Sequence, residues 1–151
     1  MVILLMGGNC TGKSSAAQAL QARYGLQIYA GKDYLRLAKT ESNAWAAFLA
    51  LLRAAQDAPL GAASVAYVVA EPELSAQLME IRAKRILFTA ELSLVQQRFA
   101  QRMGGTLPAP VAAMLTAKAA RWATVPCDVR IDTTTWTAEE TASAVIALLT
   151  A

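Results

Sequence analysis

The stretch Gly7-Gly8-Asn9-Cys10-Thr11-Gly12-Lys13-Ser14 decides how the rest of the chain is interpreted. It has the spacing of a glycine, four residues and then glycine-lysine-serine, and it follows an apolar run at residues 2–6. The segment after it, residues 14–23, has helical composition and is closed by Gly25. A strand, a glycine-rich turn and a helix in this order point backbone N–H groups and the positive end of a helix dipole at one place, which favours an anion there.

The spacing is that of the Walker A motif, whose parts have defined roles toward a nucleoside triphosphate. Lys13 is expected to reach the β- and γ-phosphates, and the Ser14 hydroxyl to ligate Mg²⁺. Chance would produce this pattern in fewer than about one in a hundred chains of this length. We therefore expect ATP and Mg²⁺ as cofactors. The predicted nucleotide-binding residues are Gly7, Gly8, Asn9, Cys10, Thr11, Gly12, Lys13, Ser14 and Ser15.

Composition excludes several other classes of protein. The 151 residues are expected to form one domain, residues 1–151. No apolar run reaches the roughly 18–20 residues of a membrane span. The apolar run at residues 2–6 has no basic leader before it, so we expect a cytoplasmic protein. Two cysteines and no histidine exclude a disulfide framework, a zinc cluster and a His-dependent triad.

Strand-like and helix-like segments alternate along the chain. Apolar runs rich in β-formers predict strands at residues 2–6, 26–30, 65–70, 86–89 and 128–131. Helices are predicted at residues 14–23, 33–56, 71–81, 90–103, 111–122 and 137–149. Thr137 and Glu140 form a capping box at the start of the last helix. Such alternation predicts an α/β fold with a parallel sheet covered by helices on both faces, hence three layers.

These features together resemble the P-loop small-molecule kinases, a family that includes nucleoside monophosphate kinases, shikimate kinases and gluconate kinases. The resemblance covers the whole chain in element order and length, while the Walker A loop is its one sharply specific motif. It implies a five-stranded parallel sheet in the order 2-3-1-4-5 and a small-molecule phosphate acceptor. The chain has no Asn-Lys-x-Asp segment, which argues against a GTPase.

Asp33 and Arg36 follow the second predicted strand, in a segment similar to the acceptor site of these kinases. Asp33 is a candidate to orient the acceptor hydroxyl or accept its proton. Arg36 is a candidate to bind a phosphate or carboxylate of the acceptor. Lys32 departs from the family pattern, and Asp33 as a simple helix N-cap is the alternative. The stripe of Trp45, Phe48 and Leu52 in the following helix is expected to be core, with an acceptor pocket as the alternative.

Glu71 ends the third predicted strand, where many P-loop proteins place an acidic residue that supports Mg²⁺. It is the second candidate metal residue beside Ser14, and the alternative is a charged residue that opens a helix. The usual aspartate is missing here, as is the Asp-Gly-x-Pro-Arg run of adenylate kinases. The paired aspartates expected after the second strand of shikimate kinases are also absent.

Arg98 and Arg102 lie four residues apart and so share one face of a predicted helix. Family resemblance implies that such arginines stabilise charge on the transferring phosphoryl group, as arginine fingers do. The glycine-bearing segment after them, about residues 103–110, is a candidate lid. Solvated arginines on an exposed face are the alternative, and Lys118 and Arg121 are lesser candidates. The loop after the fifth strand is expected to lie under adenine, which makes Asp132 and Thr133 weak candidates.

The sequence therefore predicts an ATP-dependent phosphotransferase that moves the γ-phosphate of Mg-ATP to a hydroxyl or phosphate of a small molecule. A regulatory ATPase module without an acceptor is the main alternative. A kinase that modifies RNA or protein through the basic cluster Arg82, Lys84 and Arg85 is a lesser one. The net charge of +3 and the absence of a basic stripe interleaved with aromatics argue against a nucleic-acid partner.

Overall fold

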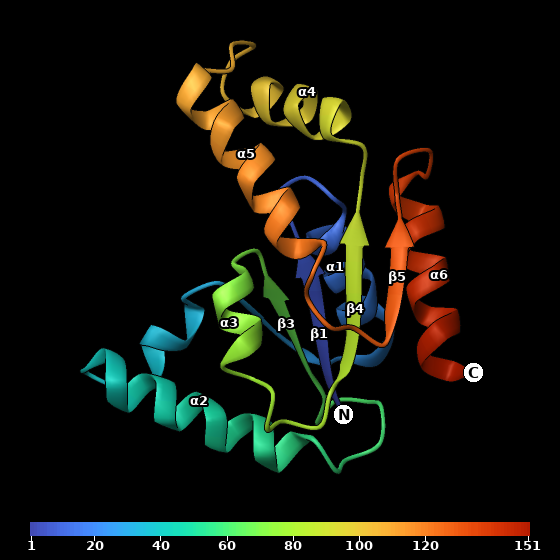
Figure 1. Cartoon of the computed structure of the whole chain (residues 1–151). Helices are drawn as coiled ribbons and strands as arrows, with labels where there is room; N and C mark the ends of the chain where they lie inside the picture. The colour runs from blue at the N-terminus through green and yellow to red at the C-terminus, as the bar shows by residue number, and fades with distance from the viewer.

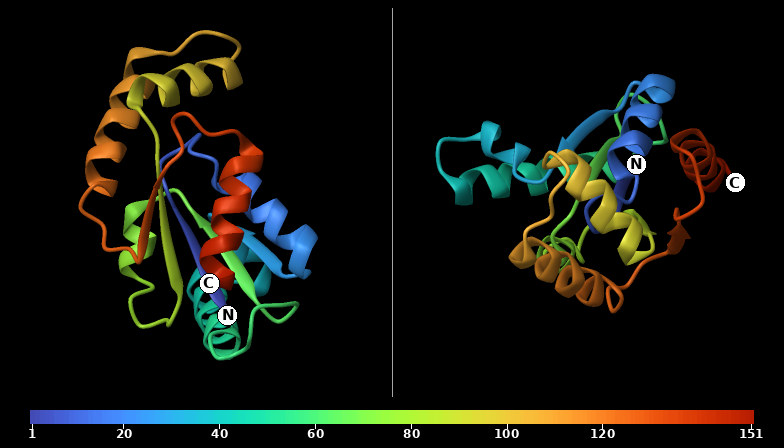
Figure 2. Two further views of the ribbon diagram at one scale, coloured as in Figure 1. Left: turned by 90° about the vertical axis from the view of Figure 1, so that its right-hand side faces the viewer. Right: turned by 90° about the horizontal axis from the view of Figure 1, so that it is seen from above.

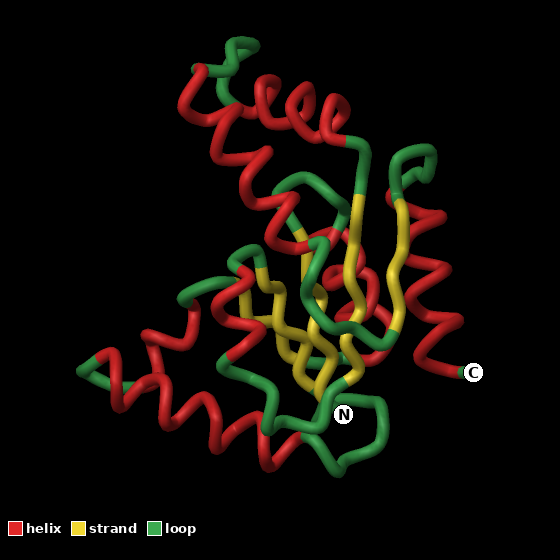
Figure 3. Tube along the Cα trace, in the orientation of Figure 1, coloured by secondary structure: helices red, strands yellow, loops and turns green.

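A five-stranded parallel sheet forms the centre of the protein, in a computed structural model that describes residues 1–151 (Figures 1 and 3). The strands are β1 (Val2–Gly7), β2 (Gln27–Ala30), β3 (Val65–Val69), β4 (Lys84–Thr89) and β5 (Val129–Asp132). Their order is β2-β3-β1-β4-β5, and every neighbouring pair is parallel. The predicted fold class and strand order are therefore confirmed.

Burial explains why β1 takes the central position. All of its residues are buried, and a strand that is covered on both faces reads as a continuous apolar run. It pairs with β3 through Leu4 opposite Tyr67 and with β4 through Leu5 opposite Ile86. The carboxyl ends of the strands consequently meet at one edge of the sheet, where the loops of interest begin.

Helices cover both faces of the sheet, as the pattern predicted (Figure 2). The helical elements are α1 (Lys13–Tyr24), the 3₁₀ helix η1 (Asp33–Leu37), α2 (Glu41–Ala55), α3 (Pro72–Ala76), α4 (Leu92–Arg102), α5 (Ala109–Trp122) and α6 (Ala138–Thr150). One core contains Ala16 and Leu20 of α1 and Val145 of α6. A second core on the other face contains residues of α2 together with Trp122 of α5.

The long helix predicted at residues 33–56 is wrong. The structure has η1, then a break, and then α2. Thr40 has an extended backbone and its side chain accepts a hydrogen bond from the backbone N–H of Asn43 at 3.3 Å, so it caps a new helix. Phe48 and Leu52 of α2 are fully buried, which confirms the core prediction for these two residues, and Trp45 is partly buried and packs against the same core.

The helix predicted at residues 71–81 is also too long, because α3 ends at Ala76. Beyond it the chain continues in turns that bury Leu78 and Ile81. Arg85 donates from Nη2 to the carbonyl oxygens of these two residues at 2.7 and 3.0 Å. A side chain thus satisfies two carbonyl groups of the turns that follow α3.

The capping box at the start of α6 is present as predicted. The Glu140 N–H donates to the Thr137 hydroxyl, and the Thr137 N–H donates to the Glu140 carboxylate, both at 3.1 Å. Gly25 likewise ends α1 in the left-handed region with φ 71°, where a residue without Cβ is favoured.

Helices α4 and α5 form a hairpin that extends beyond the carboxyl edge of the sheet (Figure 1). A small apolar cluster of Cys10, Val95 and Leu115 joins the hairpin to the loop after β1. The segment that connects the two helices holds the predicted lid, which stays a prediction. Considered for length and apolarity, none of the helices qualifies as a membrane span.

We expect Phe48→Ala to lower the free energy of unfolding by about 3–5 kcal/mol, because it empties a fully buried ring site. The Phe48 ring lies 4.8 Å from that of Tyr67 and 4.9 Å from that of Tyr29, measured between centroids. Urea unfolding measures the change, with Leu35→Ala, at a side chain that is 40% exposed, as the control. Equal losses in both variants would contradict this account of the core.

Candidate functional site

The loop that connects β1 to α1 depends on two glycines. A Cβ on Gly7 would stand 2.3 Å from the carbonyl oxygen of Phe88 in β4, and its φ is 140°. Gly12 caps α1 with φ 99°. Both positions lie in a region that side chains rarely adopt, so the Walker A glycines are a requirement of the turn. The loop thereby places the unpaired N–H groups of the first turn of α1 at its centre.

Lys13 is the first residue of α1 and is only 6% exposed. Its ammonium group donates to the carbonyl oxygen of Gly8, which also accepts a hydrogen bond from the Thr11 hydroxyl at 2.8 Å. Burial lowers the pKa of Lys13 to about 8; the nearby cations Lys118 and Arg102 also lower it, against an opposing effect of Cys10. An anion in the loop would favour the charged form of Lys13 and so offset the effects of burial and of the neighbouring cations.

A pocket of about 160 Å³ opens above this loop. Lys13, Ser14 and Ser15 line it, together with Ala70 at the end of β3 and Arg102 from α4. None of its lining residues is acidic. Ser14 is exposed at the pocket, so its hydroxyl is accessible to a ligand. This arrangement suits a phosphate group.

A second pocket of about 430 Å³ shares Cys10, Thr11, Gly12, Ser15 and Arg102 with the first. Arg98 and Gln101 of α4 line it on one side, and Thr133 and Trp136 from the loop after β5 on the other. Its size and its aromatic wall suit a nucleotide base joined to phosphates in the adjoining pocket. The two predicted arginines therefore do share one face and one pocket.

Arg98 and Thr133 also hold the loop in place. The Arg98 guanidinium donates to the carbonyl oxygen of Cys10 at 2.9 Å. The Thr133 hydroxyl, which is buried, donates to the carbonyl oxygen of Thr11 at 2.8 Å. Asp132, the other weak candidate, lies in neither pocket and instead accepts hydrogen bonds from Thr134 that lower its pKa.

The residues present fit a triphosphate with magnesium. The loop offers backbone donors, a desolvated lysine and two arginines without a carboxylate between them. No group of three acidic, histidine or cysteine side chains comes together as a metal cage. Mg²⁺ typically keeps water and phosphate ligands and needs only one or two protein groups, so the Ser14 hydroxyl is sufficient for this mode of binding.

The Glu71 carboxylate is paired with a lysine. Its Oε1 atom accepts a hydrogen bond from Lys118 Nζ at 2.7 Å, and Glu71 lines neither pocket. It precedes Pro72 at the start of α3, and its side chain makes no capping hydrogen bond. Its support of a metal remains a prediction, for which the carboxylate would first have to release Lys118.

Asp33 and Arg36 do not line either pocket. Asp33 Oδ2 accepts a hydrogen bond from the backbone N–H of Ala30, the last residue of β2, at 2.9 Å. This differs from the helix N-cap considered as the alternative. Arg36 is stacked over the ring of Tyr29, with its guanidinium carbon 4.5 Å from the ring centroid. Both roles at an acceptor stay predictions.

Lys118 and Trp136 belong to the site, although sequence reasoning gave Lys118 little weight and did not name Trp136 as a candidate. Lys118 reaches Asn9 of the loop at 3.4 Å besides Glu71, and its side chain is 11% exposed. A lysine in an Ala-rich helix looks like surface charge until α5 is placed over the loop. Trp136 follows the fifth strand by a few residues. An isolated aromatic residue in the loop after this strand was the one sequence feature that could have indicated its place in the pocket.

We expect the side chain of Lys13 to titrate near pH 8 instead of the usual value of 10.5. NMR of ¹³C-labelled lysine measures the transition, and the missing signal in Lys13→Arg assigns it. Lys118→Met is expected to raise the pKa, because it removes a neighbouring cation. Pyrophosphate is expected to raise it further. A titration near 10.5 in the wild-type protein would exclude the desolvated lysine described above.

Three solved structures illustrate what the chain is similar to. Shikimate kinase from Acinetobacter baumannii in complex with shikimate has a TM-score of 0.64 at 15% identity, covering 99% of this chain and 92% of its own. A gluconokinase from Sinorhizobium meliloti has a TM-score of 0.60 at 17% identity, covering 99% and 91%. The YorR protein of Bacillus subtilis, in complex with phosphorylated GDP, has a TM-score of 0.64 at 16% identity, covering 99% and 96%.

No family model and no curated protein matches the sequence, so the similarity is one of structure. The neighbours nevertheless match nearly the whole length of the chain. This chain has the fold of the P-loop small-molecule kinases.

Proposed function

We propose that this protein is an ATP-dependent phosphotransferase that moves the γ-phosphate of Mg-ATP to a hydroxyl or phosphate of a small molecule. The observation that carries the proposal is the desolvated Lys13 in a glycine-shaped loop, with a pocket of base size directly beside it. Structural neighbours that are shikimate, gluconate and sugar kinases support the same class of reaction.

The loop and the cations around it supply the electrostatics of such a reaction. Lys13 and the backbone N–H groups of the loop bind the β- and γ-phosphates. Arg102 borders both pockets and can neutralise charge on the transferring group, while Arg98 fixes the loop through Cys10. Mg²⁺, bound through Ser14 and the phosphates, would add charge neutralisation between the β- and γ-phosphates.

Asp33 is proposed to act on the acceptor. The acceptor oxygen forms a bond to the γ-phosphorus, the bond from that phosphorus to the β–γ bridging oxygen breaks, and ADP leaves. The proton of an acceptor hydroxyl passes to the Asp33 carboxylate. In the structure only Oδ2 of Asp33 makes a hydrogen bond, so Oδ1 is available. Arg36 is proposed to bind an anionic group of the acceptor.

Two other functions fit less of the site. A regulatory ATPase without an acceptor is favoured by the engagement of Glu71 with Lys118. A kinase that docks a polyanion through Arg82, Lys84 and Arg85 has less support, because Arg82 pairs with Asp57 and Arg85 binds backbone carbonyls. Two of the three cations in that cluster are therefore occupied within the chain.

We expect Mg-ATP turnover to depend on an acceptor from a panel of nucleosides, nucleotides, shikimate, sugar acids and aminoglycosides. ADP release measures it. Lys13→Met is expected to reduce kcat by about 10²-fold or more, because a preorganised charge at the transferring group is lost. Asp33→Asn is expected to lower kcat while the affinity for ATP stays unchanged. Slow hydrolysis that no acceptor stimulates, and that Asp33→Asn leaves unaltered, would favour the regulatory ATPase.

Nucleotide affinity is expected to fall as the pH rises above about 8. In the free protein Lys13 has a pKa of about 8, and a bound triphosphate raises it. Above pH 8 binding must therefore take up a proton, and the affinity falls by up to about tenfold per pH unit. Calorimetry with a non-hydrolysable ATP analogue in two buffers measures both quantities. Lys13→Arg, which stays charged, is the control and should show no proton uptake.

A further inference from the structure

A third cavity adjoins the site described above, on the other side of the phosphate loop. It has a volume of about 150 Å³ and lies between the end of β4, the loop after β1 and the hairpin of α4 and α5. Of its 14 lining residues, 8 are hydrophobic. The largest side chains among them are Phe88 of β4, Leu92 and Val95 of α4, and Leu115 and Trp122 of α5.

The phosphate loop separates this cavity from the nucleotide pockets. Gly8, Asn9 and Thr11 form one wall of it, but Lys13 and Ser14 do not line it. It also shares no residue of α4 with the base pocket, because Leu92 and Val95 line the cavity while Arg98, Gln101 and Arg102 line the pocket. An occupant would therefore touch the loop on its outer side without entering the phosphate site.

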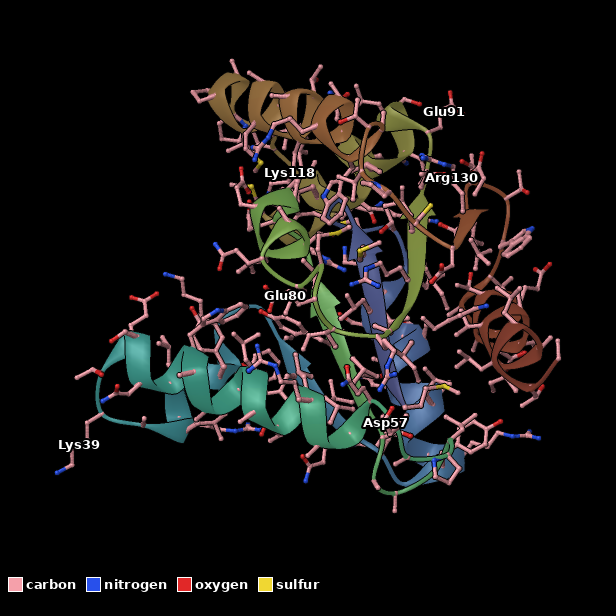
Figure 4. All side chains as sticks on the ribbon, turned by 60° about the horizontal axis from the view of Figure 1, so that its bottom comes forward. Lys39, Asp57, Glu80, Glu91, Lys118 and Arg130 are labelled. Atoms are coloured by element: carbon pink, nitrogen blue, oxygen red, sulfur yellow. The ribbon has the colours of Figure 1, made fainter.

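Two cations border the cavity, and no acidic side chain lines it. Lys118 is already paired with Glu71 at 2.7 Å. The guanidinium of Arg130 in β5 makes no ion pair or side-chain hydrogen bond within the chain, and Arg130 is exposed. Figure 4 shows Lys118 on the α5 side and Arg130 on the β5 side of the upper end of the sheet. Arg130 is thus an uncompensated cation beside an apolar chamber.

The volume and the lining define the class of ligand. An apolar cavity of about 150 Å³ accommodates a benzene-sized body. An apolar wall with one unpaired guanidinium at its border favours a ligand with a compact apolar body and a single carboxylate. We propose that this cavity is a binding site for a small aromatic or branched aliphatic monocarboxylate, held by Arg130 and occupied independently of nucleotide. The site goes beyond the proposed function and does not rest on it.

Calorimetry with benzoate as the probe tests the site, with benzyl alcohol as its neutral counterpart. We expect benzoate to bind with a stoichiometry of one and more tightly than benzyl alcohol. Arg130→Gln is expected to weaken benzoate binding by about tenfold or more, because one charge-assisted hydrogen-bonding partner is lost. The same variant should leave benzyl alcohol unaffected. Arg23→Gln removes an equal charge from an exposed position in α1 and should change neither affinity.

A blocking variant and a competition complete the test. Ala119→Phe places a ring at the lining of the cavity and is expected to abolish benzoate binding while the thermal midpoint stays close to that of the wild type. A saturating non-hydrolysable Mg-ATP analogue should leave benzoate bound. The proposal is overturned if benzoate does not bind, if Arg130→Gln and Arg23→Gln behave alike, or if the nucleotide displaces it. Lys13→Met should retain benzoate binding, so this result is separable from any failure of phosphotransferase activity.

Discussion

The close approach of Gly7 to the backbone of Phe88 is the constraint on which the functional end of this molecule depends. β1 is buried on both faces at the centre of the sheet, so the chain can leave it only along the carboxyl edge. At Gly7 a Cβ would meet the Phe88 carbonyl oxygen at 2.3 Å, and the absence of that atom lets the chain turn over β4 at once. The turn fixes where α1 begins, and with it the position of Lys13.

Positive charge collects around this turn at an electrostatic cost. Lys13 is buried, and Lys118 and Arg102 lower its pKa further, so a bound anion would stabilise the charged form of Lys13. Among these cations, only Lys118 has a carboxylate partner, which is Glu71. A loop whose donors are fixed before the ligand arrives loses little reorganisation energy when it binds, which is the physical basis of electrostatic preorganisation.

Local features of the fold were predictable from the sequence, and tertiary ones were not. The loop at residues 7–14, the buried strand before it and the capping box at Thr137 each depend on residues within a few positions of one another. The strand order came from family resemblance. The break before α2 was missed because Thr40 competes with a helix whose apolar pattern continues across it. The early end of α3 was missed because the chain beyond Ala76 turns to bury Leu78 and Ile81, and Arg85, several residues later, binds the carbonyl oxygens of these two residues.

The same distinction applies to the site. Arg98 and Arg102 were found because their spacing on one helix is a local property, and both line the base pocket. Lys118 became recognisable as a site residue only when α5 crossed over the ends of β1 and β3, bringing it to Asn9 and Glu71. Asp33 differs, because segment similarity suggested its role at an acceptor, whereas its hydrogen bond to the Ala30 N–H at the end of β2 could be seen only in the structure, and the acceptor role stays a prediction.

The hairpin of α4 and α5 has a fastened part and an exposed part, and this difference constrains how it could move. Near its carboxyl end, Lys118 pairs with Glu71, Arg121 pairs with Glu73, and the Trp122 indole N–H donates to the Ala70 carbonyl oxygen at 3.0 Å. These three contacts join the last turns of α5 to residues 70–73, which follow β3. Residues 101–110 are almost entirely exposed, by contrast. Local opening is cheapest where few buried contacts must break, so closure over the phosphates would bend the hairpin on the amino-terminal side of Lys118 and leave Lys118 fixed beside the loop.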